Sequence, residues 1–356
     1  MIILAIESSC DETSAAVVEV AGGVFTVKSN IIASQVETHR LYGGVVPEIA
    51  SRAHIEAISK ITYEALSEAN VTMADVDAVA VTANPGLIGA LLVGVNFAKA
   101  LAISYGKPII PVDHVKGHVA ACYLSENPPK PPFIALAASG GHTAIYLVED
   151  YTRHKRIGTT RDDAIGESFD KIGRLIGIPY PAGRGFDLLS REGYAKAVGD
   201  GDYPHEKYRK SPYFSEMTLP SPAVKDDSLD FSFSGLKTAA INLLHKYEQR
   251  AEEIPRELFA ARYTYEAVEA VAKKLSLALD RYPGMDLALT GGVGANSHLR
   301  KRLGEVAKSH GVTLHIPSPA LCGDNGAMIG AQAYYEYLEG NIADASLNAS
   351  AADSPS

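Results

Sequence analysis

The chain has 356 residues, with 33 Lys and Arg against 42 Asp and Glu, so its formal net charge is −9. Because a single hydrophobic core rarely grows beyond about 300 residues, the length predicts two domains. A hydrophobic fraction of 46% with 21% charged residues is that of an ordinary globular protein. The acidic balance is not that of a non-specific nucleic-acid binder, so any RNA would have to dock on local basic patches or with help from another subunit.

The first residues, 1–6, form an apolar run that has no basic stretch before it and leads at once into acidic residues. This pattern indicates a buried first strand and not a signal peptide. The sequence has no uninterrupted run of 18 or more apolar residues, so we expect no membrane span. Cys10, Cys122 and Cys322 are far apart and form no C-x-x-C pair, which predicts reduced thiols in a cytoplasmic protein.

The first half of the chain is predicted to begin with three strands. Residues 2–6 and 14–20 are apolar strands, and a third strand is expected at 24–34. The turn between the first two, SSCDET at 8–13, holds hydroxyls and carboxylates together, which suits a nucleotide phosphate and its metal. The elements expected next are a helix at 47–69, a strand at 78–81, a helix at 91–103 and a strand at 109–112.

Two histidines follow the last of these strands. His114 and His118 lie four residues apart in a segment that suits a helix, so both side chains are expected on one face. Two imidazoles on one face can bind a single metal ion and leave further coordination positions open. A pair of ordinary histidines, one capping and one on the helix surface, is the alternative. The carboxyl ends of strands are where open α/β sheets place their ligands, which favours the metal site.

The second half repeats the opening pattern after a proline-rich linker at 128–132. A strand at 133–138, a polar glycine turn at 139–143 and a strand at 144–148 correspond to the start of the chain, which predicts an internal duplication with the ligand in a cleft between the halves. The remaining expected features are an irregular insertion at about 150–230, helices from 236 to 279 with a break near 253–255, a strand at 286–290, a glycine turn at 291–296, a helix at 297–309, a strand at 313–316, a helix ending near 338, and a disordered tail at 341–356.

Several motifs together resemble one family. They are SSCDET at 8–13, YGGVVPEIASRAH at 42–54, the H-x-x-x-H at 114–118, ASGGHT at 138–143, GESFDK at 166–171, YPAGRGFD at 180–187, FSGLKTA at 233–239, GGVGANSHLR at 291–300 and CGDNGAMIG at 322–330. In this order the chain, over roughly 1–340, resembles the bacterial TsaD (Gcp) family of tRNA adenosine threonylcarbamoyltransferases. Ala182 stands where many relatives have a second glycine.

The resemblance implies an α/β fold of the actin/Hsp70/sugar-kinase type, with two RNase-H-like halves around a nucleotide cleft. The first subdomain would span 1–127 and be completed by a C-terminal helix at 324–340. The second would span 133–322 and contain the insertion. This agrees with the duplication that the strand pattern predicts.

The resemblance also implies the activity. The enzyme would move a threonylcarbamoyl group from threonylcarbamoyl-AMP to N6 of the adenosine at position 37 of tRNAs that read codons beginning with A. His114, His118 and Asp324 would bind one divalent ion, iron or zinc. The positions matching the family's donor-binding segments are Ala137, Ala138, Ser139, Gly140 and Gly141 for the threonylcarbamoyl-phosphate part, and Asp170, Gly183, Asp187 and Asn296 for the nucleoside.

Removing a proton from the adenosine amine calls for a carboxylate, and Asp11 and Glu12 are the candidates.

Basic residues at 154–156 and 300–302 are candidates for tRNA phosphate contacts, although a solvated surface explains them equally well. By resemblance, the helix from Pro47 would bind a TsaB-like paralogue, and a TsaE-like ATPase would join the complex.

Three other classes of function share parts of this pattern. An actin-type ATPase or sugar kinase would share the fold but would not need the histidine pair with a distant aspartate. A metalloprotease of the H-E-x-x-H kind needs a glutamate after the first histidine as general base, and this chain has Val115 there. A non-catalytic scaffold is a third class, and paralogues of that kind typically lack the histidine pair.

Overall fold

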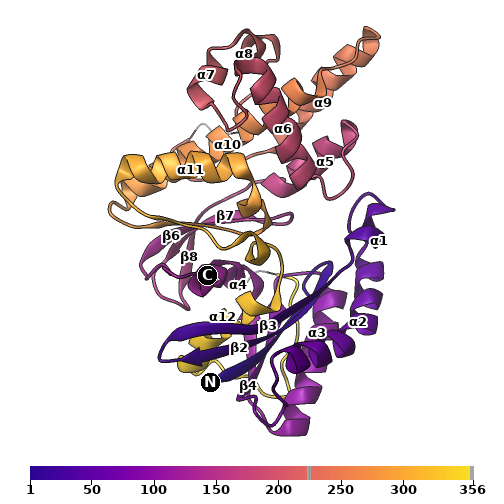
Figure 1. The fold of residues 1–356 in the computed structure, drawn as a ribbon, viewed down its shortest axis with the longest axis vertical. Helices are drawn as coiled ribbons and strands as arrows, with labels where there is room; N and C mark the ends of the chain where they lie inside the picture. The colour runs from indigo at the N-terminus through magenta and orange to yellow at the C-terminus, as the bar shows by residue number, and fades with distance from the viewer. Residues whose placement is uncertain (223, 225, 353–356) are drawn as a thin grey trace. The chain divides into compact units, whose positions relative to one another are not determined.

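A computed structural model describes residues 1–222, 224 and 226–352. The chain divides into two compact units. Unit 1 contains Met1–Pro131, Val148–Lys155 and the described part of His315–Ser356, and unit 2 contains Pro132–Leu147 and Arg156–Leu314. Figure 1 shows the helices and strands of both units.

Unit 1 is built on a five-stranded sheet in the order β3-β2-β1-β4-β5. The pairs β1–β2 and β2–β3 are antiparallel, whereas β1–β4 and β4–β5 are parallel. The strands are β1 (Ile2–Glu7), β2 (Glu12–Ala21), β3 (Val24–Ser34), β4 (Ala78–Asn84) and β5 (Ile109–Asp113). The helices are α1 (Val36–Arg40), α2 (Pro47–Glu68), α3 (Ile88–Tyr105), α4 (His114–Ala120), α12 (Gly326–Leu338) and the short 3-10 turns η1 (Ala121–Leu124) and η3 (Pro319–Leu321).

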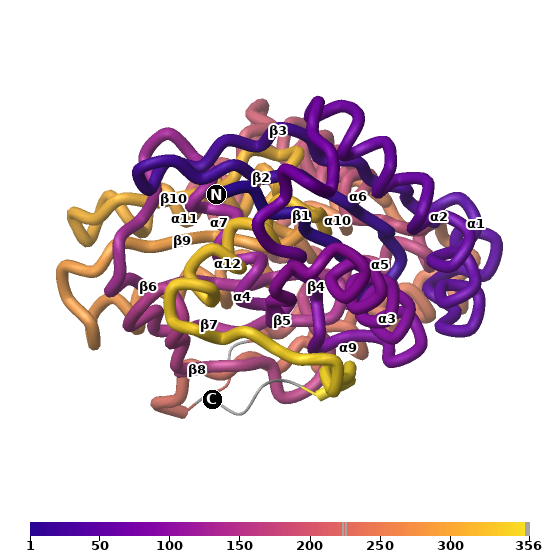
Figure 2. Tube along the Cα trace, turned by 90° about the horizontal axis from the view of Figure 1, so that it is seen from below, coloured from indigo at the N-terminus to yellow at the C-terminus, as the bar shows by residue number. Residues whose placement is uncertain are grey.

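Helices cover both faces of this sheet. Successive side chains of β1 point to opposite faces. Ile3 and Ala5 therefore pack in one cluster with Met328 and Ile329 of α12, whereas Leu4 packs in another cluster with α2 and α3. Because both faces are covered at β1, the strand is apolar from Ile2 to Ile6 and does not alternate. Figure 2 shows α12 beside α4, so a helix from the end of the chain completes the unit that begins it.

The long helix α3 is the one described helix that, by length and composition, would suit a membrane span, with a mean hydropathy of 1.6. Its Leu91, Val95 and Ala98 are buried, and Val95 and Ala98 belong to the cluster beneath β1 and β4. A core helix of a globular domain passes the same criterion.

Unit 2 repeats the arrangement of unit 1. Its sheet has the order β10-β9-β6-β7-β8, which is the order of the first sheet when each is counted from its own first strand. The predicted duplication is thereby confirmed. The strands are β6 (Phe133–Ala138), β7 (Thr143–Val148), β8 (His154–Thr159), β9 (Leu287–Thr290) and β10 (Leu314–His315). The helices are α5 (Ile165–Leu175), α6 (Gly183–Val198), α7 (His205–Arg209), α8 (Pro212–Glu216), α9 (Ser234–Gln249), α10 (Arg256–Arg281), α11 (Ser297–His310) and the 3-10 turn η2 (Gly292–Ala295).

The stretch at 150–230 is more regular than its composition indicates. Residues 154–159 form β8, the outer strand of the duplicated sheet, and two well-formed helices, α5 and α6, follow. Helix α6 packs on α10, where the backbone of Gly193 lies so close to Glu257 that a Cβ would fall 1.9 Å from its carbonyl oxygen. The many glycines that make this stretch look irregular include one that serves close helix packing.

The tail from residue 341 was predicted to be disordered, and this is wrong for the part that the structure describes. Ala343 N donates to Ile109 O of the edge strand β5 at 2.9 Å, and Ser350 N donates to Ala83 O at 2.9 Å. Leu347 packs against the core and accepts from Lys99 Nζ at 2.9 Å. Backbone pairing with an edge strand requires no particular side chains, so composition could not reveal it. Residues 353–356 lie outside the described residues.

Close backbone contact between α12 and β2 leads to a stability prediction. A Cβ on Gly326 would lie 2.7 Å from Ala16 N and 3.0 Å from Ala15 C, both backbone atoms that cannot move alone. We expect Gly326→Ala to destabilise unit 1 by about 1–3 kcal/mol, measured by chemical denaturation followed by circular dichroism.

The control for this prediction is Gly304→Ala in α11, where a Cβ would meet nothing within 4 Å. Replacing a helical glycine in open space should stabilise the protein by about 0.5–1 kcal/mol. Equal effects of the two substitutions would contradict the packing account.

Candidate metal centre

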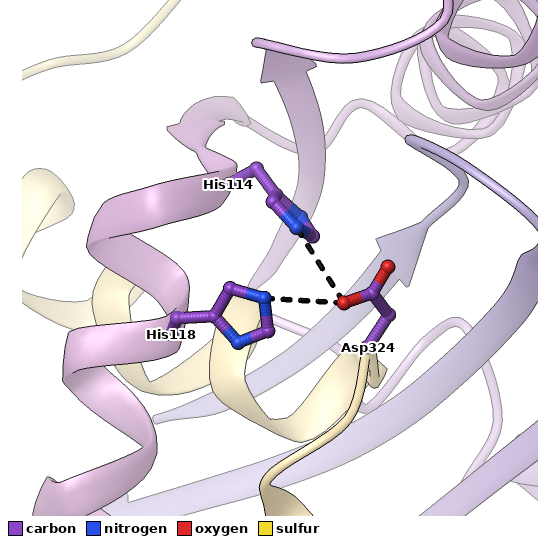
Figure 3. A group of neighbouring side chains, drawn as sticks. All are labelled: His114, His118 and Asp324. Carbon is purple, nitrogen blue, oxygen red and sulfur yellow. Dashed lines mark ion pairs between the residues drawn. The ribbon is translucent and has the colours of Figure 1, made fainter. Parts of the chain in front are cut away.

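Helix α4 presents both predicted histidines on one face. Asp113 ends β5 and caps the helix, since its Oδ1 accepts from Val115 N at 2.9 Å and Lys116 N at 3.1 Å. The rings of His114 and His118 then lie with centroids 4.6 Å apart, and both residues are buried. The predicted i, i+4 arrangement is therefore present (Figure 3).

Asp324 reaches the same point from the segment before α12. Its Oδ1 lies 3.1 Å from His118 Nε2 and 3.5 Å from His114 Nε2. The next residue, Asn325, caps α12 by accepting from Met328 N at 2.9 Å, which fixes the chain direction at Asp324. The three side chains that the family resemblance grouped together are thus neighbours within unit 1 (Figure 3).

These residues fit a divalent metal ion. One potential ligand atom from each of the three residues can be chosen so that all lie within 4.8 Å of one another. Tetrahedral zinc ligands about 2.0–2.1 Å from the ion are about 3.3 Å apart, close to the 3.1 and 3.5 Å seen here. Neither ring nitrogen of the buried His118 makes a hydrogen bond among the described residues, although Nε2 faces Asp324. A buried polar group without a hydrogen bond is costly, and an ion would satisfy it.

His114 and the carboxylates beside it shift one another's pKa values. Burial by itself would lower the pKa of His114, but the carboxylates of Glu7 and Asp324 outweigh it and raise this pKa to about 9. Burial would raise the pKa of Glu7, whereas His114 lowers it more. Without a metal ion, His114 is therefore the cation that balances these carboxylates at neutral pH.

The turn after β1 carries the two candidate proton acceptors, Asp11 and Glu12. Burial raises the pKa of Glu12 to about 9, and the neighbouring Asp11 and the carboxylate of Asp324 add to the effect. In the metal-free protein, these neighbouring carboxylates and burial therefore favour the protonated form of Glu12.

His54 of α2 supports this turn, a role that the sequence reasoning missed. It is buried, its Nε2 donates to Cys10 O at 2.9 Å, and its Nδ1 accepts from Thr13 Oγ1 at 2.7 Å. Burial lowers the pKa of His54, in keeping with a neutral ring that donates at one nitrogen and accepts at the other. A histidine within the helix motif at 42–54 was the available signal.

The turn at 139–141 in unit 2 follows β6, where Ala137 and Ala138 are the last two residues of the strand. It is closed by Ser139 N donating to His142 O at 2.8 Å and His142 N donating to Ser139 Oγ at 3.1 Å. Gly140 and Gly141 have nothing within 4 Å of a notional Cβ, so the backbone is open on that side. An open glycine backbone can approach a phosphate or carbonyl oxygen closely.

The four predicted nucleoside-binding residues gather around the start of α6. Asp170 Oδ1 accepts from Ala182 N at 2.7 Å, directly before Gly183. Asp187 accepts from Ser297 N at 3.0 Å, and Asn296 caps α11 by accepting from Leu299 N at 2.8 Å. All of these residues belong to unit 2, and their role in binding a nucleoside stays a prediction.

The candidate phosphate-binding residues are engaged within the protein. Arg302 Nε lies 2.7 Å from the buried Glu269, Lys301 donates to Asp202 O, and Arg300 donates to Gly294 O. Burial lowers the pKa of His154 to about 3, so this residue is not a cation at neutral pH. The role of these basic segments in contacting tRNA phosphates stays a prediction.

The fold and the site define a class of protein: a duplicated α/β chain of the actin/Hsp70/sugar-kinase type with a two-histidine, one-carboxylate centre in its first unit. HypF from T. kodakarensis matches with a TM-score of 0.57 and 14% identity, covering 97% of this chain and 49% of that chain. Component A of (R)-2-hydroxyglutaryl-CoA dehydratase from Acidaminococcus fermentans matches with a TM-score of 0.50 and 12% identity, covering 94% and 97%. These likenesses support the predicted fold class alone.

Sequence relatives identify the family. The family model described as "TsaD: tRNA N6-adenosine threonylcarbamoyltransferase" matches residues 26–331. A relative of that name from Clostridium perfringens is 47% identical over 348 residues, covering 98% of this chain and 96% of the relative. One from Clostridium botulinum is 47% identical over 347 residues with the same coverage. The chain belongs to the TsaD family and transfers a threonylcarbamoyl group to an adenosine of tRNA; a kinase or protease is not favoured.

The raised pKa of His114 leads to a prediction for the metal-free protein. The proton on His114 stabilises the folded state fully below the unfolded pKa of 6.5, and this contribution is lost as the pH rises toward 9. We expect the unfolding free energy of metal-free wild type to fall by up to about 3 kcal/mol over this window. Denaturant titrations at several pH values, in the presence of a chelator, measure it.

Glu12 shifts stability in the same direction over this window, so the comparison must be made with His114→Ala. In that variant the fall between pH 6.5 and 9 should be clearly smaller. A fall of equal size in the variant would contradict the charge balance described above.

Proposed function

We propose that the chain transfers the threonylcarbamoyl group of threonylcarbamoyl-AMP to N6 of adenosine 37 in tRNAs that read codons beginning with A, at a metal centre of His114, His118 and Asp324. The observation that carries the proposal is the meeting of these three side chains within one unit, where the buried Nε2 of His118 faces the Asp324 carboxylate at 3.1 Å. The substrate details follow from membership of the family.

The ion in this proposal is zinc or iron. Two imidazoles and one carboxylate are a donor set that both metals accept, and they leave coordination positions for oxygens of the donor. When bound, the ion supplies positive charge that stabilises the negative charge developing on carbonyl and phosphate oxygens. His114 and His118 would hold the ion through Nε2, and Asp324, whose Oδ1 faces both of these nitrogens, would be the third ligand.

The donor's threonylcarbamoyl-phosphate part is assigned to the backbone of 137–141, because the open glycine turn leaves room for close approach. Its nucleoside is assigned to Asp170, Gly183, Asp187 and Asn296. Asp187 is the proposed acceptor for ribose hydroxyls, and its bonds from Ser297 N and Oγ hold the carboxylate in place.

Proton transfer is assigned to the turn after β1. The adenosine amine attacks the carbamoyl carbonyl carbon, AMP leaves, and the amine loses one proton. Asp11 is the proposed acceptor, because burial and neighbouring carboxylates raise the pKa of Glu12 in the metal-free protein, and Glu12 is proposed to donate a hydrogen bond beside it.

The proposed partners are tRNA, a TsaB-like paralogue and a TsaE-like ATPase, in the cytoplasm. Apolar side chains on α2 and the segment before it support a protein partner there. Ile55 and Tyr63 on α2 are 64% and 80% exposed, and Leu41 and Tyr42 are exposed as well. Exposed apolar residues gathered on neighbouring segments are typical of interaction surfaces.

The test is a reconstituted reaction with synthetic threonylcarbamoyl-AMP, unmodified tRNA and the partner proteins, with the modified nucleoside measured by mass spectrometry. We expect His118→Ala to lower the rate at least 100-fold, on the order of 3 kcal/mol, because the ion that stabilises the oxyanion is lost. Asp11→Asn should lower the rate by less, and Glu12→Gln should retain more activity than Asp11→Asn because Gln keeps a hydrogen-bond donor.

The control is His245→Ala, a change of the same type at an exposed position of α9. It should leave the rate unchanged. If His118→Ala binds no metal and still turns over at the wild-type rate, the metal centre is refuted.

A further inference from the structure

Glu7, the last residue of β1, is a carboxylate buried beside the metal centre. It has no exposed surface. A buried charge costs several kcal/mol unless hydrogen bonds and an opposite charge satisfy it. The groups that surround Glu7 therefore indicate the role of its carboxylate.

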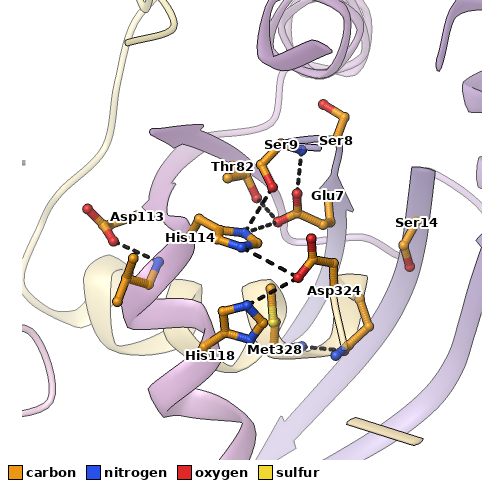
Figure 4. Close-up of polar contacts among 12 residues, drawn as sticks. Glu7, Ser8, Ser9, Ser14, Thr82, Asp113, His114, His118, Asp324 and Met328 are labelled. Atoms are coloured by element: carbon orange, nitrogen blue, oxygen red, sulfur yellow. Dashed lines mark hydrogen bonds and ion pairs between the residues drawn. The ribbon is translucent and has the colours of Figure 1, made fainter. Parts of the chain in front are cut away.

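Three groups approach the Glu7 carboxylate (Figure 4). Oε1 accepts from Ser9 N at 2.5 Å, and Oε2 accepts from Thr82 Oγ1 of β4 at 2.6 Å. Oε2 also lies 3.0 Å from His114 Nδ1. The first two bonds tie the carboxylate to the turn after β1 and to β4, so the third holds the imidazole against a fixed carboxylate.

We propose that Glu7 is a positioning residue that accepts the Nδ1 proton of His114 in a hydrogen bond and so turns the free electron pair of Nε2 toward the ion. The inference rests on the proposed metal centre. In an imidazole, a proton fixed at one nitrogen leaves the other nitrogen as the ligand. A carboxylate behind a metal-binding histidine also fixes the ring orientation and raises its basicity.

A competing arrangement lies within reach. Ser9 Oγ is 3.1 Å from the same Nδ1 and can donate its hydroxyl proton to it. That bond would require the other tautomer, with the proton on Nε2, which cannot bind a metal. Glu7 selects between the two, because an ionised carboxylate can only accept.

His118 offers a contrast within the same site. Its ring nitrogens make no hydrogen bond among the described residues. The two histidines are therefore supported unequally, and the loss of Glu7 should act through His114 alone.

The experiment uses the full chain and Co²⁺ or Zn²⁺ as the probe. Glu7→Gln keeps the size of the side chain, but its amide group must face either Ser9 N–H, as donor against donor, or His114 Nδ1, which favours the wrong tautomer. We expect a 10–100-fold weaker metal affinity by competition with a chelator, and an altered visible absorption spectrum of the Co²⁺ protein. Glu7→Asp keeps the acceptor and should restore part of the affinity.

Ser29→Ala is the matched control, because Ser29 is a buried residue of β3 in the same unit and its hydroxyl donates to Ala65 O at 2.7 Å. Its metal affinity and Co²⁺ spectrum should be those of wild type. Thr82→Val removes one hydrogen bond to Glu7 with little change in shape, and should weaken metal binding less than Glu7→Gln does. If Glu7→Gln does not fold, Thr82→Val alone decides the matter.

Wild-type affinity and spectrum in Glu7→Gln, or in Thr82→Val where that variant decides, would overturn the role of Glu7 while leaving the metal centre intact. Equal losses in Glu7→Gln and Ser29→Ala would also overturn it, since a general loss of structure would explain both. Failure of wild type itself to bind either ion would overturn the metal centre and the role of Glu7 together.

Discussion

The contact between α12 and the first sheet determines where Asp324 lies. The backbone of Gly326 lies so close to the backbone of β2 that no Cβ would fit between them. Met328 and Ile329 share a core cluster with residues of β1. Asp324 precedes this helix by two residues, so its carboxylate is carried to the face of α4 that holds the histidines. The metal centre is therefore a consequence of core packing, and a change that shifts α12 must also shift a ligand.

Charge is the second constraint. Glu7, Asp11, Glu12 and Asp324 are acidic groups in and beside one largely buried region, and an excess of negative charge there is unfavourable. The metal-free protein reduces it in two ways, by keeping a proton on Glu12 and by charging His114. A divalent cation would supply this positive charge directly and would release the proton from His114 Nε2. The acidic turn after β1 and the histidine pair are thus parts of one electrostatic arrangement.

The sequence predicted the strands, the duplication and the histidine pair because these depend on local spacing. The pair at His114 and His118 follows from helical geometry alone. Asp324 could be assigned only through family resemblance, since no spacing rule connects it to α4. Glu7 was missed because its partners, Thr82 and His114, come from β4 and α4, although a carboxylate at the end of an apolar strand was a signal. The tail was misjudged because its attachment runs largely through backbone groups, which composition does not reveal.

X-ray absorption at the metal edge of the Zn²⁺-loaded protein tests the central claim most directly. The account predicts two imidazole nitrogens and at least one carboxylate oxygen at about 2.0–2.2 Å, with one imidazole lost in His118→Ala. A spectrum without imidazole scattering, or one with a sulfur ligand at about 2.3 Å, would contradict it.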